Sequence, residues 1–117
     1  MPKAKTPSPA SSSTLLSNPI TQLDDLWIAG RHRLLCAKSD DTAAMNRLKG
    51  DTERPVIVDP PWPIGNTLIA SEVLGAHCYA LVADAQAIDK AIDRWQRFTG
   101  QKAIQSETGI AFGDTAS

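Results

Sequence analysis

Apolar residues recur along the chain with helical spacing in some stretches and as short continuous runs in others. Within 85–98, Ile88, Ala91, Ile92 and Trp95 lie three or four residues apart, which is the spacing of one face of an amphipathic helix. Two more helices are expected because each stretch carries helix-forming residues and is followed by a glycine that can end it. These two helices are expected at 40–49 and 66–74.

The continuous runs are short, apolar and rich in β-branched residues, which is typical of strands that fit a pleated surface. The expected strands are 26–28, 33–36, 56–59 and 78–82, with a last edge strand at 102–104. The first two flank Gly30 and predict a β-hairpin or two sequential short strands. Because strands and helices alternate from the second strand onward, the next strands are expected to join it in a parallel sheet.

The most informative stretch is the end of the third strand. Val56–Val58 is followed by Asp59, Pro60, Pro61 and Trp62. Pro60 has no amide hydrogen and Pro61 restricts the residue before it, so the strand is expected to stop at Asp59. The loop then presents a carboxylate, free carbonyls and an indole at the carboxyl end of a strand, which is where open α/β sheets bind ligands.

A loop of this composition suits the activation of an amino group on a nucleobase. The nitrogen of such a group is a poor nucleophile because its lone pair is delocalised into the ring. Two acceptors for its hydrogens, the Asp59 carboxylate and the Pro60 carbonyl, would raise its electron density. Trp62 would stack on a base taken out of the duplex, as aromatic side chains do in base-flipping enzymes. The alternative is a strand that simply stops at two prolines beside a packed indole.

Three stretches resemble, in the same order, the amino-directed DNA methyltransferases, which methylate adenine or cytosine with S-adenosylmethionine. They are LWIAGRHRLLC (26–36), VDPPW (58–62), and GNTLIA (65–70) running on to DRWQRFTG (93–100). The resemblance covers 23–104 and follows the subclass of the family that places its cofactor loop last. It implies that Asp59, Pro60, Pro61 and Trp62 are the catalytic residues.

The resemblance also implies a cofactor site, where the chain departs from the family pattern. Family members insert a target-recognition segment and then a strand with a Phe-x-Gly-x-Gly loop, whereas this chain runs from Trp62 almost directly to Gly65. Val82 stands where an acid would hold the ribose, and 37–38 (Ala-Lys) replaces Gly-Asp. Gly65 and Asp84 remain as cofactor-binding candidates. Taken alone, Gly65 is typical of the start of a helix and Asp84 of a helix cap.

The predicted fold is a small three-layer α/β domain. By resemblance it is a partial Rossmann-type methyltransferase fold, with a short, mainly parallel sheet and about three helices. The domain is expected to span 23–104. Residues 1–22 are rich in Pro and Ser and predict a disordered tail, and 105–117 predict a flexible C-terminal tail. A sheet of about three strands buries little surface, so marginal stability is expected.

Composition and charge limit the classes of partner that the chain is expected to bind. The 117-residue chain has a net charge of −1 and gives no general attraction to phosphate, so DNA binding would need a local basic patch. Arg31–Arg33 is such a cluster, although a solvated turn is the favoured interpretation. Cys36 and Cys78 lack metal-ligand spacing and are expected to be reduced core residues of a cytoplasmic chain. No apolar run is long enough to span a membrane.

These patterns predict a site-specific DNA methyltransferase-like protein that is shortened and inactive, with adenine favoured as the base. S-adenosylmethionine is the expected cofactor by resemblance. DNA and a full-length methyltransferase are the expected partners, and neither a metal ion nor a membrane is expected. Two other classes stay open: a non-catalytic module that binds DNA or protein through the Pro-Pro-Trp loop, and a decayed gene product.

Overall fold

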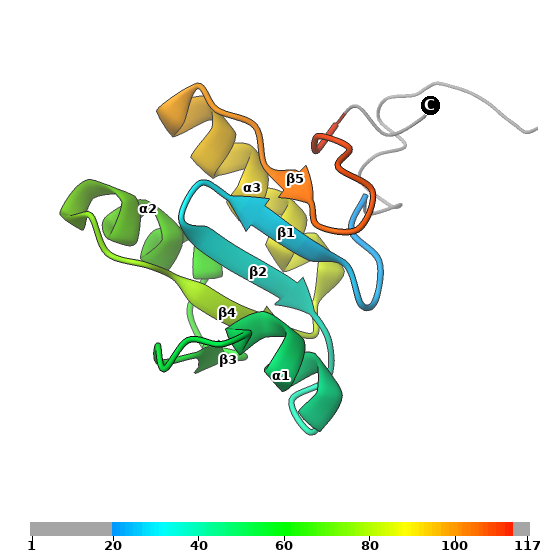
Figure 1. The fold of residues 1–117 in the computed structure, drawn as a ribbon. Helices are drawn as coiled ribbons and strands as arrows, with labels where there is room; N and C mark the ends of the chain where they lie inside the picture. The colour runs from blue at the N-terminus through cyan, green and yellow to red at the C-terminus, as the bar shows by residue number, and fades with distance from the viewer. Residues whose placement is uncertain (1–19, 114–117) are drawn as a thin grey trace, which may run out of the picture.

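One mixed sheet with the strand order β3-β4-β2-β1-β5 forms the centre of the molecule (Figure 1). The computed structural model describes residues 20–113. The strands are β1 (Leu26–Ala29), β2 (His32–Cys36), β3 (Ile57–Val58), β4 (Tyr79–Val82) and β5 (Ile104–Gln105). β4 lies between β2 and β3 and runs parallel to both, whereas β1 pairs antiparallel with β2 and with β5. The sheet is therefore mixed rather than mainly parallel, because the hairpin adds antiparallel pairings to the parallel core.

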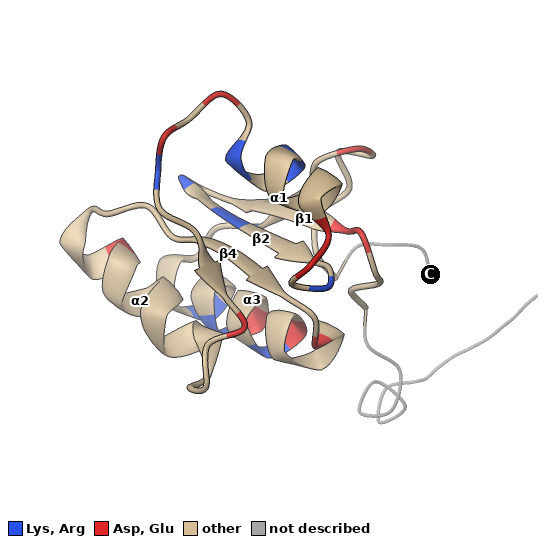
Figure 2. Ribbon diagram, turned by 90° about the horizontal axis from the view of Figure 1, so that it is seen from below, with Lys and Arg blue, Asp and Glu red and all other residues tan. Residues whose placement is uncertain are grey.

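Three helices cover the two faces of this sheet. Figure 2 shows α1 (Thr42–Lys49) on one face and α2 (Ile64–Leu74) and α3 (Ala85–Thr99) on the other. The two apolar clusters agree with this division: one joins the sheet to Leu48 of α1, and the other joins it to Leu68 of α2 and Ile92 of α3. The α/β class and the three helices are as the sequence predicted.

The central strands are buried on both faces, which explains their continuous apolar runs. In β2, Leu35 packs toward α1 while Leu34 packs toward α2 and α3. In β4, Leu81 and Ala80 divide between the two faces in the same way. Every second residue of each strand thus faces the same helices, as the two-residue period of a strand requires.

α3 is the element that the sequence defined best. Its buried residues are the four that the spacing selected: Ile88, Ala91, Ile92 and Trp95. The side chain of Asp84 caps its first turn, and Gly100 ends it in the left-handed conformation. α2 begins at Ile64, two residues earlier than expected, because Pro63 is its N-cap residue and pre-sets the backbone there.

Both ends of the described region pack against the domain. The backbone N–H groups of Ile20 and Thr21 donate to the Asp89 carboxylate at 2.7 and 2.9 Å. Phe112 is buried edge-on against Trp27, with ring centroids 5.2 Å apart. Residues 20–22 and 105–113, which we expected to belong to the two tails, are thus part of the domain in this structure. The remainder of both expected tails, 1–19 and 114–117, lies outside the described residues.

The turn between β1 and β2 differs from the solvated basic cluster favoured from the sequence. Arg31 donates from Nε to the Ala76 carbonyl at 2.8 Å and from Nη2 to the Glu72 carbonyl at 3.1 Å, and so binds the last turn of α2. His32 is fully buried, and its Nδ1 accepts the Cys78 N–H at 3.0 Å. Hydrogen bonds to distant parts of the chain hold Arg31 and His32 in place. The charge pattern of the sequence does not reveal these bonds.

No helix between residues 20 and 113 is long and apolar enough to cross a membrane.

Candidate functional site

Asp59 follows β3 at the carboxyl edge of the parallel strands. Its N–H donates to the Leu81 carbonyl at 3.0 Å, which continues the pairing with β4 by one residue. Its backbone then turns into the left-handed region, with φ of 40°, which Asp tolerates better than most residues. Its Oδ1 accepts the Ala83 N–H at 2.9 Å. Within the described chain nothing donates to Oδ2, so this oxygen is free to accept from a ligand.

Trp62 is held beside Asp59 with its ring in solvent. The side chain is 48% exposed, and its Nε1 donates to Thr67 Oγ1 at 2.7 Å in the second turn of α2. Asp59, Pro60 and Trp62 together line a hollow of about 240 Å³. This smaller hollow is completed by Pro63, Ile64, Val82, Asp84 and Ala87. Pro61 is exposed and does not line it.

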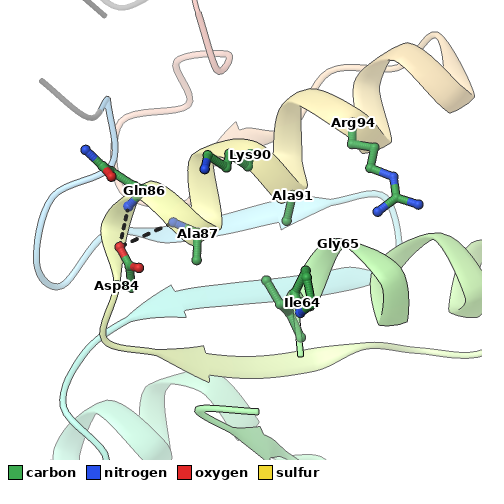
Figure 3. A pocket seen from close by; sticks show the side chains of 9 residues that line it. Ile64, Gly65, Asp84, Gln86, Ala87, Lys90, Ala91 and Arg94 are labelled. Atoms are coloured by element: carbon green, nitrogen blue, oxygen red, sulfur yellow. Dashed lines mark hydrogen bonds between the residues drawn. The ribbon is translucent and has the colours of Figure 1, made fainter. Parts of the chain in front are cut away.

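A larger hollow of about 410 Å³ adjoins the smaller one between the starts of α2 and α3 (Figure 3). The two hollows share Pro63, Ile64, Asp84 and Ala87 as a common wall. The other residues that line the larger hollow are Gly65, Gln86, Lys90, Ala91 and Arg94. Predicted catalytic and cofactor-binding residues therefore line adjoining hollows at one edge of the sheet.

Gly65 and Asp84 both have structural roles. Asp84 Oδ1 accepts the N–H groups of Gln86 and Ala87 at 3.0 and 3.4 Å, which is the cap of α3 (Figure 3). A Cβ atom built on Gly65 would lie 3.4 Å from the Ala91 Cα and 3.4 Å from a guanidinium nitrogen of Arg94. Gly65 thus lies in the contact between α2 and α3, where a methyl group would just touch α3. The cap is the alternative that the residue type suggested for Asp84, and Gly65 lies at the start of a helix, as its alternative had it.

Two of the positions that differ from the pattern of the resembled family lie at the same edge. Val82 is 4% exposed, lines the smaller hollow and has no group that accepts a hydrogen bond from a ribose hydroxyl. Ala37 is buried and its N–H donates to the Val82 carbonyl at 3.2 Å, while Lys38 is exposed. Across residues 20–113 no group of three or more His, Cys, Asp or Glu side chains is placed to hold a metal ion.

Two cations of the larger hollow, Lys90 and Arg94, were not predicted as site residues from the sequence. They lie four residues apart on α3, so they share a helical face with Ala87 and Ala91. Figure 3 shows Arg94 extending toward the start of α2. Its Nη1 donates to Asn66 Oδ1 at 2.7 Å. The four-residue spacing was visible in the sequence, but only the packing of α2 on α3 shows that this face borders a hollow.

A partly buried polar cluster at the other end of α2 was also not predicted. Glu72 Oε1 accepts from His32 Nε2 at 3.1 Å and from Trp95 Nε1 at 2.9 Å, and Oε2 lies 3.6 Å from Arg31 Nη2. Since His32 Nδ1 accepts from Cys78 N–H, its proton is on Nε2 and the ring is neutral. Burial lowers the pKa of His32, against the raising effect of Glu72. The Trp95 hydrogen bond lowers the pKa of Glu72.

Both cysteines are buried, reduced residues of the core. Burial raises the pKa of Cys36 and of Cys78 to about 11, so both are protonated at neutral pH and are poor nucleophiles. They are Sγ–H groups packed among apolar side chains, as their isolated positions in the sequence suggested.

Comparisons of the chain with models of protein families, with curated proteins and with solved structures found no significant match.

Proposed function

We propose that this chain is a shortened relative of the amino-directed DNA methyltransferases, which binds a nucleobase amino group and does not transfer a methyl group by itself. Adenine is the favoured base, and we interpret the small α/β domain with its carboxyl-edge site as a partial Rossmann-type fold. The observation that carries the proposal is that Asp59, Pro60 and Trp62 line one hollow while Asp59 Oδ2 stays free.

The geometry suits a planar ring with an exocyclic amine. One Asp59 oxygen is fixed by the Ala83 N–H, so the carboxylate is held in place while the other oxygen can accept. No described group donates to the Pro60 carbonyl, which would take the second hydrogen. The indole of Trp62 is exposed and anchored at its nitrogen, which leaves its face available for stacking at little cost in side-chain entropy.

The residues predicted to bind the cofactor support a chain that binds a nucleobase without transferring a methyl group. S-adenosylmethionine is proposed to occupy the site weakly or not at all, because only Gly65 remains of the family's glycine loop and one oxygen of Asp84 is used by the helix cap. Val82 offers no acceptor for a ribose. DNA, and a full-length methyltransferase that supplies target recognition, are the proposed partners.

Calorimetric titration of the full chain with 2′-deoxyadenosine tests the proposal. Asp59→Asn keeps the oxygen that accepts from Ala83 but replaces the free oxygen with an amide donor, so affinity should fall about tenfold or more. Asp51→Asn changes an exposed carboxylate in the loop before β3 and should leave the affinity unchanged.

A second variant and its control test the stacking contact of Trp62. Trp62→Leu should weaken the binding of deoxyadenosine, whereas Phe98→Leu, which alters another exposed ring on α3, should not. Titration with S-adenosylmethionine should give no micromolar binding, and methylation-free DNA should stay unmethylated. Absence of deoxyadenosine binding would contradict the proposed base site. Micromolar S-adenosylmethionine binding that Asp59→Ala abolishes would overturn the inactive assignment.

A further inference from the structure

The larger hollow carries positive charge that the base-binding loop does not use. Lys90 and Arg94 line it, and in the described part of the chain neither forms an ion pair. Both side chains are exposed and one helical turn apart. The hollow therefore presents two cations on the same side.

The two acidic residues within α3, Asp89 and Asp93, form no ion pair with these cations. Asp89 accepts the N–H groups of Ile20 and Thr21. Asp93 pairs with Arg97 at 3.1 Å on the exposed side of the helix. Asp84, which precedes the helix, accepts from its first turn through Oδ1 and also lines the larger hollow. The lining of this hollow thus holds two cations, Lys90 and Arg94, and one carboxylate, which leaves a positive balance.

The two hollows are arranged as two parts of one ligand site. They share Ala87 on α3, and Lys90 lies about 4.5 Å farther along the helix axis, with Arg94 about 6 Å beyond it. A base stacked on Trp62 in the smaller hollow would direct its sugar over the common wall. The next group along the chain of a nucleotide would then reach Lys90 and Arg94, which lie farther along α3 than Ala87 (Figure 3).

Small side chains leave room for this group. Ala87 and Ala91 on α3 and Gly65 on α2 form the floor of the larger hollow, and a Cβ on Gly65 would already touch α3. The guanidinium of Arg94 uses one nitrogen for Asn66, which orients the planar group at the rim. The remaining N–H groups of Arg94 and the ammonium of Lys90 are suited to phosphate oxygens.

We propose that the larger hollow binds the phosphate of the nucleotide whose base stacks on Trp62, with Lys90 and Arg94 as its ligands. The inference rests on the proposed function, and it specifies the substrate class as a phosphorylated nucleotide or a strand of nucleic acid rather than a free nucleoside. It also assigns this hollow to the substrate instead of to a methyl donor.

Titration of the full chain compares 2′-deoxyadenosine with its 5′- and 3′-monophosphates at low salt. At least one monophosphate should bind about tenfold more tightly than the nucleoside, because two partly exposed ion pairs of this kind together contribute about that factor. The advantage should shrink as salt is added, and millimolar inorganic phosphate should compete with the monophosphate but not with the nucleoside.

The Lys90→Gln/Arg94→Gln double variant should bind nucleoside and monophosphate equally, with nucleoside affinity unchanged. The control is Arg97→Gln/Lys102→Gln, which removes two exposed cations that do not line the hollow and should keep the advantage. Thermal melts and circular dichroism establish that both double variants are folded.

The outcomes separate this inference from the function on which it rests. Equal binding of nucleoside and monophosphates by the wild-type chain overturns the phosphate site and leaves the base site standing. Loss of nucleoside binding in the Lys90→Gln/Arg94→Gln variant also overturns it, because the cations would then hold the base. If neither ligand binds, the proposed function and this inference fail together.

Discussion

Removing the Glu72 carboxylate should destabilise the domain more than any surface substitution. Glu72 is the common acceptor for two ring N–H groups, those of His32 and Trp95, and both rings are fully buried. Glu72→Ala would leave both donors without their partner. Buried donors that lose their acceptors cost their desolvation penalty, about 1–3 kcal/mol each.

For the two donors together this gives about 2–6 kcal/mol, and the structure places the expected loss in the lower half of that range. The Glu72 side chain is 19% exposed, so water can enter the space that the truncation leaves and satisfy part of the lost bonding. We expect Glu72→Ala to lower the free energy of unfolding by about 2–3 kcal/mol, which corresponds to roughly 10–20 °C in Tm for a domain of this size. Glu72→Gln keeps an acceptor oxygen and should cost about 1 kcal/mol.

Urea titration followed by circular dichroism measures both variants against Glu53→Ala, which truncates an exposed acid in the loop before β3. Glu53→Ala should lie within about 0.5 kcal/mol of the wild-type chain. The reasoning is refuted if Glu72→Ala is no more destabilising than Glu53→Ala, or if Glu72→Gln costs as much as Glu72→Ala.

Two further predictions concern pH and helix packing. Burial holds the pKa of His32 below 6.5, so the unfolded chain binds more protons and the free energy of unfolding should fall as pH drops through 6.5. The His77→Asn background removes the other histidine, and urea titrations of this variant at pH 7.5 and 5.5 should show the fall in the free energy of unfolding. Adding His32→Gln should abolish the fall. An equal fall with and without His32 would contradict the prediction. Gly65→Val should cost about 1–3 kcal/mol by forcing α3 away from α2, while Gly65→Ala should be nearly neutral in thermal melts. Equal melting of the two Gly65 variants would show that the helices tolerate separation.

The elements of this fold were predictable where the pattern is local. The spacing of Ile88, Ile92 and Trp95 requires a helix that buries one face, and the apolar run of β4 requires a strand covered on both sides. Caps are local as well, so Asp84 could be recognised from its position before α3. Such features depend on residues within one or two turns of each other.

The sheet order could not be read from the sequence because strand pairing joins distant residues. Arg33 pairs with Tyr79 across β2 and β4, and this pairing places β3 at the edge of the sheet. The periodicity within each strand is the same whichever neighbour it has. For the same reason β5 and its contact with β1 were expected only as an unplaced edge strand.

The candidate site likewise has one part that local sequence patterns predict and another part that depends on contacts between distant residues. Asp59, Pro60 and Trp62 are close in sequence, and a strand that stops at two prolines brings them together. Asp84 joins them because parallel strands end at one edge. The place of Lys90 and Arg94 depends on how α2 packs on α3, and the burial of His32 depends on Glu72 across the fold. No pattern of neighbouring residues in the sequence indicates these contacts.

Nitrogen-15 NMR of the full chain during addition of 2′-deoxyadenosine tests the central claim most directly, because the three tryptophans give separate indole signals. The exposed indole of Trp62 and the Ala83 amide bonded to Asp59 should shift together as the site fills, while the buried indoles of Trp27 and Trp95 stay in place. Shifts confined to other surfaces, or no shift at Trp62 up to millimolar nucleoside, would contradict a base-binding site at the end of β3.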